Sequence, residues 1–304
     1  MNTHQSRRQF LKQSAFAAGA LALASDNLLG ATPAVKRTAV DVVPLGNTGL
    51  KISRLAMGTG SNNGHTQTAL GRDGFIKLVH YAYDHGVRAF DCAEAYATFT
   101  WMADAIKGLP RENIYLQSKI DHPPQDVLAA IDHHRKVFNT DYVDSMLVHC
   151  QVEPGWTDRW QAAMDGFDQA KAKQMIKAKG VTCHSLPALR RAVESDWTEV
   201  HQVRINPQGR RMDGMEINVW PGNDPGHDIA PVVAELKNMR AKGRGVIGMK
   251  IIGNGTFINP EDREKSIRFA MSRPELDAIV IGFKSTAEID EAIERMNRAL
   301  AENA

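Results

Sequence analysis

The sequence predicts an α/β fold, a (β/α)8 barrel of the TIM type. Two observations lead to this prediction. Short apolar runs alternate along the chain with amphipathic stretches of helical period. Strict alternation favours a parallel sheet, because parallel strands need a crossover that is usually a helix. About eight such units in about 260 residues fit a closed barrel.

The expected strands and helices follow one another in order. Strands are expected near residues 54–57, 88–91, 114–118, 145–149, 180–183, 200–206, 245–249 and 278–281. The clearest helical patterns are Gln125–Phe138, Trp160–Lys179, Ile229–Lys242 and Thr286–Ala301. A doubly wound open sheet is the alternative. No Gly-x-Gly-x-x-Gly motif follows an expected strand and opens a helix, which counts against a Rossmann domain.

The first residues predict an export signal. Ser6–Lys12 contains the pair Arg7-Arg8 in a full match to the twin-arginine (Tat) signature, and the modestly apolar stretch Ser14–Ala24 follows it. That stretch is too short for a stable membrane span, which needs about 20 residues. We therefore expect a signal peptide over residues 1–24, with cleavage as late as residue 34, no membrane anchor, and a periplasmic protein that engages the Tat machinery.

The rest of the chain, residues 35–304, is expected to form a single barrel domain. A hydrophobic content of 43% in 304 residues gives an ample core. Removing residues 1–24 removes three basic side chains and no acidic one, so the formal charge falls from +2 to −1. This balance indicates neither nucleic-acid nor membrane binding.

Polar residues end three of the expected strands. Asp91, Lys119 and His149 each follow an apolar run, and Tyr96 lies just beyond the first of them. Because the ends of neighbouring parallel strands meet at one rim, these four groups should converge there. Taken singly, each has a structural explanation, such as a buried ion pair or a packed aromatic ring. Together they predict a site for proton transfer.

This arrangement resembles the aldo-keto reductases. Asp91 and Tyr96 match the family's Asp-x4-Tyr, Lys119 its third-strand lysine and His149 its fourth-strand histidine. The similarity spans roughly residues 42–300. It also includes the hairpin at Leu45–Ser53, the end of the first strand at Met57–Thr59, and later strands at Val200–Pro207, Gly245–Lys250 and Ile279–Gly282.

The resemblance implies an NAD(P)-dependent oxidoreductase that interconverts a carbonyl and an alcohol by hydride transfer. Tyr96 would be the general acid/base, and Lys119 would lower the pKa of its phenol. Asp91 would hold Lys119 in place. His149 would donate a hydrogen bond to the substrate oxygen. The alternative is a non-catalytic sensor or partner protein that binds a dinucleotide on the same barrel.

The resemblance also implies where the cofactor binds. Gln202 and Thr182 would meet the nicotinamide amide, Met249 would pack on its ring, and Lys250 and Gly253 would meet the pyrophosphate. The full expected set is Gly58, Thr59, Asp91, Thr182, Gln202, Met249, Lys250, Gly253, Gly282, Lys284, Ser285 and Glu288. NAD and NADP both remain open, because Glu288 suits a ribose hydroxyl whereas Lys284 or Ser285 suits a phosphate. Export of a folded protein suggests a tightly bound dinucleotide.

The substrate is expected to be a small carbonyl compound, an alcohol or a sugar. Tyr96 and His149 would contact it, and Trp101, Trp156 and Trp220 would wall its pocket. No spacing of histidines, cysteines and acids predicts a metal site.

The sequence contains three cysteines, Cys92, Cys150 and Cys183, an odd number for an exported protein. We expect free, partly buried thiols. A Cys150–Cys183 disulfide is the alternative.

Overall fold

The computed structural model describes residues 36–214 and 226–302. The predicted signal peptide at residues 1–24, both cleavage positions and Trp220 lie outside the described residues. No helix within the two described ranges has the length and apolar character that crossing a membrane requires.

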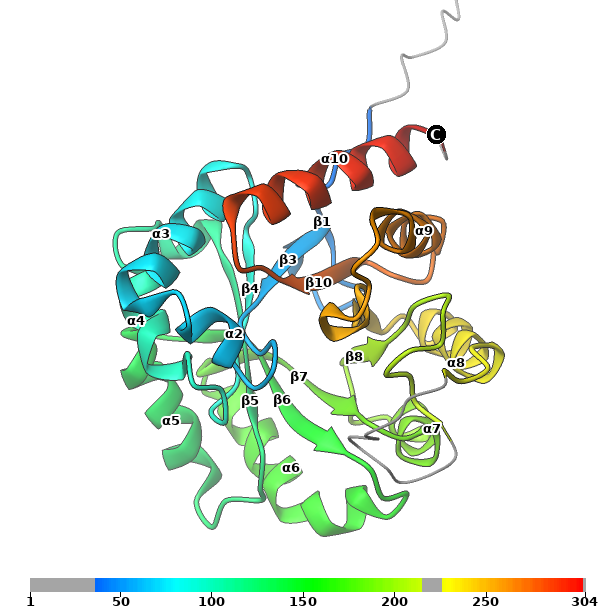
Figure 1. Ribbon diagram of the computed structural model, residues 1–304. Coiled ribbons are helices and arrows are strands. Elements are labelled where there is room, and N and C mark those ends of the chain that lie inside the picture. Colours follow the sequence, from blue (N-terminus) through cyan, green and yellow to red (C-terminus); the bar gives the residue numbers. More distant parts are fainter. Residues whose placement is uncertain (1–35, 215–225, 303–304) are drawn as a thin grey trace, which may run out of the picture. The chain divides into compact units, whose positions relative to one another are not determined.

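Eight parallel strands form a closed barrel, and the predicted (β/α)8 fold is confirmed (Figure 1). The strands are β3 (Leu55–Gly58), β4 (Ala89–Asp91), β5 (Tyr115–Ile120), β6 (Val143–Gln151), β7 (Ile176–Cys183), β8 (Val200–Arg204), β9 (Gly245–Met249) and β10 (Ala278–Gly282). They pair in chain order, and β10 closes the barrel by pairing with β3. All carboxyl ends therefore point to one rim, where barrel enzymes carry their active sites.

Helices surround the strands as an outer ring (Figure 1). They are α2 (His65–Thr68), α3 (Gly71–Asp84), α4 (Met102–Ile106), α5 (Val127–Phe138), α6 (Trp156–Ala172), α7 (Leu186–Glu194), α8 (Ala230–Ala241), α9 (Pro260–Met271) and α10 (Thr286–Glu302), with short 3₁₀ turns η1 (Phe99–Trp101), η2 (Arg111–Asn113) and η3 (Gly253–Gly255). Local sequence fixes several helix starts. Asp126 accepts a hydrogen bond from the Ala129 amide at the start of α5, and Ser185 accepts one from the Ala188 amide at the start of α7.

Side chains along each strand alternate between the two faces of the sheet, so the apolar residues form two layers. One set of strand residues points into the barrel, for example Leu147, Val200 and Ile247. The other set packs outward against the helices, for example Val148 and Val203. Because successive residues of a strand face opposite sides, the parity of a residue decides whether it reaches the barrel mouth or the helix layer.

The predicted hairpin covers the amino-terminal end of the strands. β1 (Val42–Pro44) pairs antiparallel with β2 (Lys51–Ser53). Leu45 and Ile52 are fully buried and join the inner apolar cluster. The hairpin therefore closes the end of the barrel opposite to the rim that carries the site.

One predicted helix boundary is wrong. The helix expected over Trp160–Lys179 ends at Ala172, and residues 176–179 belong to β7. Gln174 has a φ of 60°, a left-handed conformation that no helix continues through. After it, Ile176 and Ala178 are buried and alternate with half-buried lysines, which is the period of a strand.

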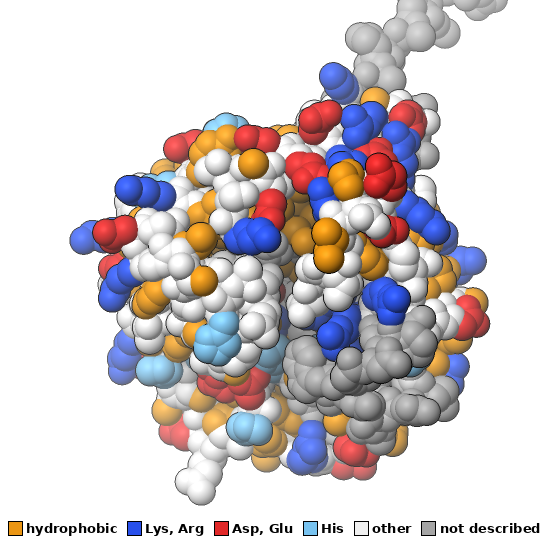
Figure 2. All heavy atoms as spheres, in the orientation of Figure 1, with side chains coloured by type: hydrophobic (Ala, Val, Ile, Leu, Met, Phe, Trp, Pro, Cys, Tyr) orange, Lys and Arg blue, Asp and Glu red, His pale blue; other side chains and the backbone are white. Residues whose placement is uncertain are grey.

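Lys, Arg, Asp and Glu side chains of both signs are interspersed on the face shown in Figure 2. This mixture agrees with the near-neutral charge of the chain.

Candidate active site

The barrel brings the four predicted catalytic residues together at its carboxyl rim. Asp91 is the last residue of β4, Lys119 lies near the end of β5, and His149 lies near the end of β6. These three strands are consecutive neighbours in the barrel. Tyr96 comes from the loop after β4, and its ring meets that of His149 edge to face at a centroid distance of 5.5 Å.

The Tyr96 hydroxyl lies between an ammonium and an imidazole. Lys119 Nζ is 3.5 Å from the hydroxyl and His149 Nε2 is 3.4 Å from it. Lys119 Nζ also donates to Asp91 Oδ1 at 2.5 Å and to the Cys92 carbonyl at 2.8 Å. The lysine is therefore held mainly by Asp91 and the backbone, as the sequence predicts for Asp91.

The expected lowering of the Tyr96 pKa by Lys119 is wrong for this structure. Burial raises the pKa of Tyr96 well above its ordinary value, and the charge of Asp91 raises it further. The reason is geometric, because the Lys119 ammonium is closer to Asp91 than to the phenol. The carboxylate of Asp91 opposes the field of Lys119 that would stabilise a phenolate.

His149 has a partner that the sequence analysis did not predict. Its Nδ1 hydrogen-bonds to Asp121 Oδ1, from the segment directly after β5. Burial lowers the pKa of His149, and Asp121 opposes that shift. A signal for Asp121 exists in the sequence, because it shares the parity of Lys119 and so points to the same side of β5.

Gln117 is a second residue that the sequence analysis missed. Its Nε2 donates to Asp91 Oδ1 at 2.7 Å and to Gln202 Oε1 at 2.9 Å. Gln202 Nε2 in turn donates to Asp91 Oδ2 at 3.1 Å. Both oxygens of Asp91 are thus bonded, which fixes the carboxylate in one orientation.

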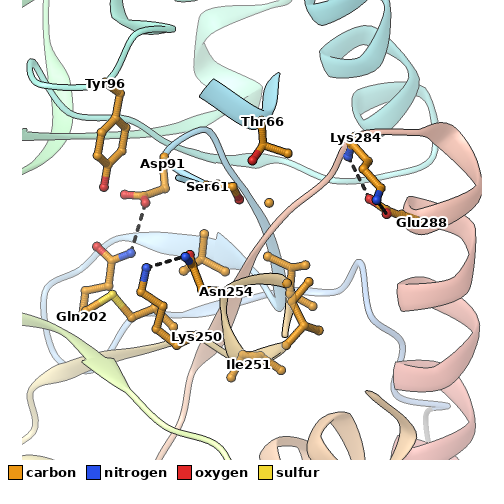
Figure 3. A pocket seen from close by; sticks show the side chains of 18 residues that line it. Ser61, Thr66, Asp91, Tyr96, Gln202, Lys250, Ile251, Asn254, Lys284 and Glu288 are labelled. Atoms are coloured by element: carbon orange, nitrogen blue, oxygen red, sulfur yellow. Dashed lines mark hydrogen bonds and ion pairs between the residues drawn. The ribbon is translucent and has the colours of Figure 1, made fainter. Parts of the chain in front are cut away.

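A cavity of about 260 Å³ opens beside Tyr96 (Figure 3). Its walls carry Gly58, Gly60, Ser61, Thr66, Asp91, Tyr96, Gln202, Met249, Lys250, Ile251, Ile252, Asn254, Gly255, Val280, Ile281, Gly282, Lys284 and Glu288. Nine of these residues belong to the predicted catalytic and cofactor sets.

Glycines keep the cavity open. A Cβ on Gly282 would lie 1.9 Å from Ser61 Oγ, and a Cβ on Gly60 would lie 2.3 Å from Tyr96 Cζ. Such close backbone walls suit a ligand that runs along the strand ends.

A second cavity of about 230 Å³ adjoins the first. The two share Ile252, Gly255, Ile281, Lys284 and Glu288. Phe257, Ile258 and Phe283 add apolar walls to the second cavity. Together the cavities form a groove that begins at Tyr96 and ends between α9 and α10, which fits an elongated ligand with a flat apolar end.

A sequence model of the aldo/keto reductase family matches residues 54–302. The chain belongs to the aldo/keto reductase family.

Its similarity to individual members is low. It is 28% identical over 182 residues to the uncharacterized oxidoreductase YtbE of Bacillus subtilis, covering 53% of this chain and 63% of that protein. It is 25% identical over 134 residues to the 9,11-endoperoxide prostaglandin H2 reductase of Trypanosoma cruzi, covering 42% and 47%. The chain thus spans less than two thirds of the length of these curated relatives.

Solved structures of aldo-keto reductases share the fold. The holo form of an enzyme from Bacillus halodurans matches with a TM-score of 0.67 at 13% identity, over 87% of this chain and 96% of that one. An aldo/keto reductase from Brucella melitensis matches with a TM-score of 0.61 at 20% identity, over 88% and 99%.

Several aldo/keto reductase positions assigned by resemblance do not reach the groove in this member. Thr182 is buried, and its hydroxyl accepts a hydrogen bond from the Cys150 amide. Thr59 is buried and donates to the Asp91 carbonyl. Ser285 accepts from the Glu288 amide in the first turn of α10. Gly253 does not line the cavity, whereas its neighbours Asn254 and Gly255 do.

Two of the three tryptophans predicted to wall the substrate pocket, Trp101 and Trp156, do not line either cavity. Trp156 is fully buried under α7, where its Nε1 donates to the Ala188 carbonyl, so its assignment to the pocket is wrong. Trp101 packs against Phe75 at a ring distance of 6.0 Å and does not line either cavity. Large apolar side chains near strand ends can serve the helix layer as well as a pocket, and only packing decides between them.

The three cysteines are free. Cys150 Sγ lies 2.8 Å from His184 Nδ1, and burial raises the pKa of Cys92 and of Cys150 to about 11. Within the described ranges, no group of three or more His, Cys, Asp or Glu side chains is placed to hold a metal ion.

Proposed function

We propose that this chain is an NAD(P)-dependent oxidoreductase that interconverts a carbonyl and an alcohol, with Tyr96 as the general acid/base. One observation carries the proposal. Tyr96 lines the groove formed by the two adjoining cavities, and its hydroxyl lies within 3.5 Å of both Lys119 Nζ and His149 Nε2. A proton donor in that position can serve an oxygen whose charge changes during hydride transfer.

The groove residues fit NAD or NADP. Lys250 lines the cavity, and burial lowers its pKa to about 8, so the ammonium form still predominates at pH 7. Its Nζ donates to Asn254 Oδ1 at 3.0 Å (Figure 3). Lys250, Gly58 and Gly282 would hold the pyrophosphate, by charge and by close backbone approach. The nicotinamide, when bound, supplies or accepts the hydride.

Glu288 is the residue that would choose between the two dinucleotides. It accepts a hydrogen bond from the Lys284 amide at 2.8 Å, and Lys284 Nζ lies 3.7 Å from its other oxygen. Both side chains line the shared part of the groove. A carboxylate there would accept from a ribose hydroxyl and repel a 2′-phosphate. Glu288→Arg is therefore expected to raise the affinity for NADP relative to NAD, as measured by cofactor titration.

The substrate would be a small carbonyl compound, an alcohol or a sugar. The names of two further relatives fit this class. One is the NAD/NADP-dependent indole-3-acetaldehyde reductase of Schizosaccharomyces pombe and the other the methylglyoxal reductase DkgA of Salmonella typhimurium. Both names describe reduction of an aldehyde or ketone group, which is the reaction that the Tyr96 site supports.

The protein would work in the periplasm with a tightly bound dinucleotide. The proposal rests on the Arg7-Arg8 signature and the apolar stretch Ser14–Ala24. Replacing Arg7 and Arg8 by Lys is expected to leave the full-length precursor in the cytoplasm. Fractionation of cells with an antibody against the barrel checks this, and export of the Lys-Lys variant would contradict the Tat assignment.

Tyr96→Phe is the first test of the chemistry. The substitution removes the hydroxyl and keeps the ring, so the fold should persist while turnover falls by about 10²-fold to 10⁴-fold. The purified protein is denatured and any released nucleotide is identified by mass. Turnover is then followed at 340 nm with a panel of aldehydes, ketones and sugars.

Three outcomes separate the alternatives. Released dinucleotide with Tyr96-dependent turnover supports the reductase. Dinucleotide binding without turnover would instead favour the non-catalytic sensor. A protein that binds neither NAD nor NADP would overturn the cofactor assignment.

A further inference from the structure

Asp121, His149 and Tyr96 form a continuous hydrogen-bonded chain at the rim. Asp121 Oδ1 contacts His149 Nδ1, and His149 Nε2 lies 3.4 Å from the Tyr96 hydroxyl. Asp121 is not one of the four residues on which the family resemblance rests. Its own position is fixed, because its amide donates to Glu94 Oε1 at 2.7 Å.

The hydrogen bond from His149 to Asp121 determines which nitrogen of His149 carries the proton. An ionised carboxylate only accepts hydrogen bonds, so Nδ1 must be the donor to Asp121. In the neutral ring the other nitrogen, Nε2, then has a lone pair. His149 therefore accepts from the Tyr96 hydroxyl. Donation from Nε2 to a substrate oxygen, the role expected from the sequence, requires the imidazolium.

The surroundings of Tyr96 agree with this direction of the hydrogen bond. Burial and Asp91 raise the pKa of the phenol, so Tyr96 keeps its proton and does not act as a preformed phenolate. A neutral phenol can donate to Nε2 while its own oxygen accepts from an alcohol. Tyr96 then accepts a proton from the alcohol and donates its own phenol proton to His149 Nε2.

We propose that Asp121 is a positioning residue that makes His149 the proton acceptor behind Tyr96. The proposal rests on the proposed function. During oxidation of an alcohol, the hydroxyl proton moves to Tyr96 and the phenol proton moves to His149 Nε2. When bound, an oxidised nicotinamide would accept the hydride of the carbinol carbon, and the alcohol would thereby become a carbonyl. The imidazolium is paired with Asp121 until it releases its proton to water.

The charged and titratable groups around His149 come from three sides. Asp121 and Lys119 face it from the β5 side, Asp91 from β4, and the His184 ring lies 6.4 Å away, centroid to centroid, on the β7 side. Burial lowers the pKa of His149, Lys119 lowers it further, and Asp121 raises it. Removal of Asp121 would therefore lower it more and destabilise the imidazolium.

The first test reads the tautomer directly and needs no substrate. Protein labelled with ¹⁵N-histidine is studied by two-bond ¹H–¹⁵N correlation, and His149→Gln assigns the signal. The wild-type ring is expected to be the Nδ1–H form near pH 7.5. Asp121→Ala should convert it to the Nε2–H form, and Asp121→Glu should restore the original form. Asp141→Ala, at an exposed position, is the matched control.

The second test is the pH profile of alcohol oxidation. In the wild type, kcat/KM should rise with pH through the ionisation of His149, below the ordinary histidine value of about 6.5. Asp121→Ala and the nearly isosteric Asp121→Asn should lower kcat by about 10²-fold and remove that inflection. Asp121→Glu should recover part of both.

The role of Asp121 and the proposed function can each be contradicted without the other. An Nε2–H ring in the wild type, or an unchanged pH profile in both Asp121 variants, would overturn the role of Asp121. If the wild type turns over no carbonyl or alcohol, the proposed function fails. The NMR result then decides the assignment of Asp121 by itself.

Discussion

Gly60 shows how one missing side chain positions the catalytic tyrosine. A Cβ at this residue would lie 2.3 Å from Tyr96 Cζ and 2.7 Å from the Tyr96 hydroxyl. The ring therefore rests directly on the backbone after β3. No motif in the sequence indicates this contact, because it joins two loops that only the barrel brings together.

Gly60→Ala is expected to push the Tyr96 ring away from His149 while the barrel stays folded. Displacement of a catalytic group by about 1 Å can cost about 10²-fold in rate, and we expect kcat to fall by that order. Steady-state kinetics with a circular-dichroism melt separates the two effects. Gly155→Ala is the control, because a Cβ there meets no atom within 4 Å. Equal kinetics in both variants would argue against the contact.

Single residues were predictable where chemistry requires a particular side chain. Asp91, Tyr96, Lys119 and His149 were placed at the rim because strand ends converge in any parallel barrel. Trp156 was misplaced because an indole serves a core and a pocket equally well, and its burial depends on α7. The sign of the Tyr96 pKa shift depends on distances of a few ångströms, which spacing in sequence does not give.

At the scale of the element, consecutive residues of β8 face opposite sides of the sheet and have different roles. Gln202 faces the barrel and bonds Asp91, whereas His201 shares the parity of Val203 and faces the helix layer. His201 is 1% exposed, and neither of its ring nitrogens has a hydrogen-bond partner. Burial lowers the pKa of His201 to about 3.

His201 should make the protein less stable in mild acid. Between the folded value of about 3 and the unfolded value of about 6.5, the unfolded chain binds more protons. The free energy of unfolding therefore falls as the pH drops below about 6.5, by up to about 1.4 kcal/mol per pH unit. Burial also lowers the pKa of His184, which adds a contribution of the same sign.

His201→Phe is expected to reduce this loss of stability in acid and to cost little at pH 7. The reason is that it replaces a buried ring without hydrogen bonds by an apolar one. Urea unfolding at several pH values between 4 and 7.5 measures the change. His122→Leu, at an exposed position, is the control for loss of a histidine. An unchanged slope in His201→Phe would show that His201 does not cause the acid sensitivity.

At the scale of the whole molecule, Asp277 forms hydrogen bonds with three separate elements at the end of the barrel opposite to the site. Its Oδ2 accepts from the Gly46 amide of the hairpin at 3.0 Å and from the Val246 amide of β9 at 2.9 Å. Its Oδ1 accepts from Arg240 Nη1 of α8 at 2.8 Å. These partners are far apart in sequence, and all lie at the end of the barrel away from the site.

Asp277→Ala should therefore lower stability without changing catalysis. The substitution leaves the buried Val246 amide and the partly buried Gly46 amide without an acceptor, and we expect a loss of about 3 kcal/mol in the free energy of unfolding. Denaturant unfolding measures it, and kcat at 25 °C should stay at the wild-type value. Asp196→Ala removes a carboxylate that is 94% exposed and should cost less than about 1 kcal/mol. Similar losses in the two variants would contradict the role of Asp277.

The sequence by itself determined the barrel, the hairpin and the identity of the four rim residues. Apolar periodicity reports which elements form, and parallel strands leave little choice about where their ends meet. The tertiary structure decided which side chains share an environment. It placed Asp121 on His149, Gln117 on Asp91 and Trp156 in the core. Burial and the electric field at a group depend on all its neighbours in space, and strand order alone does not set them.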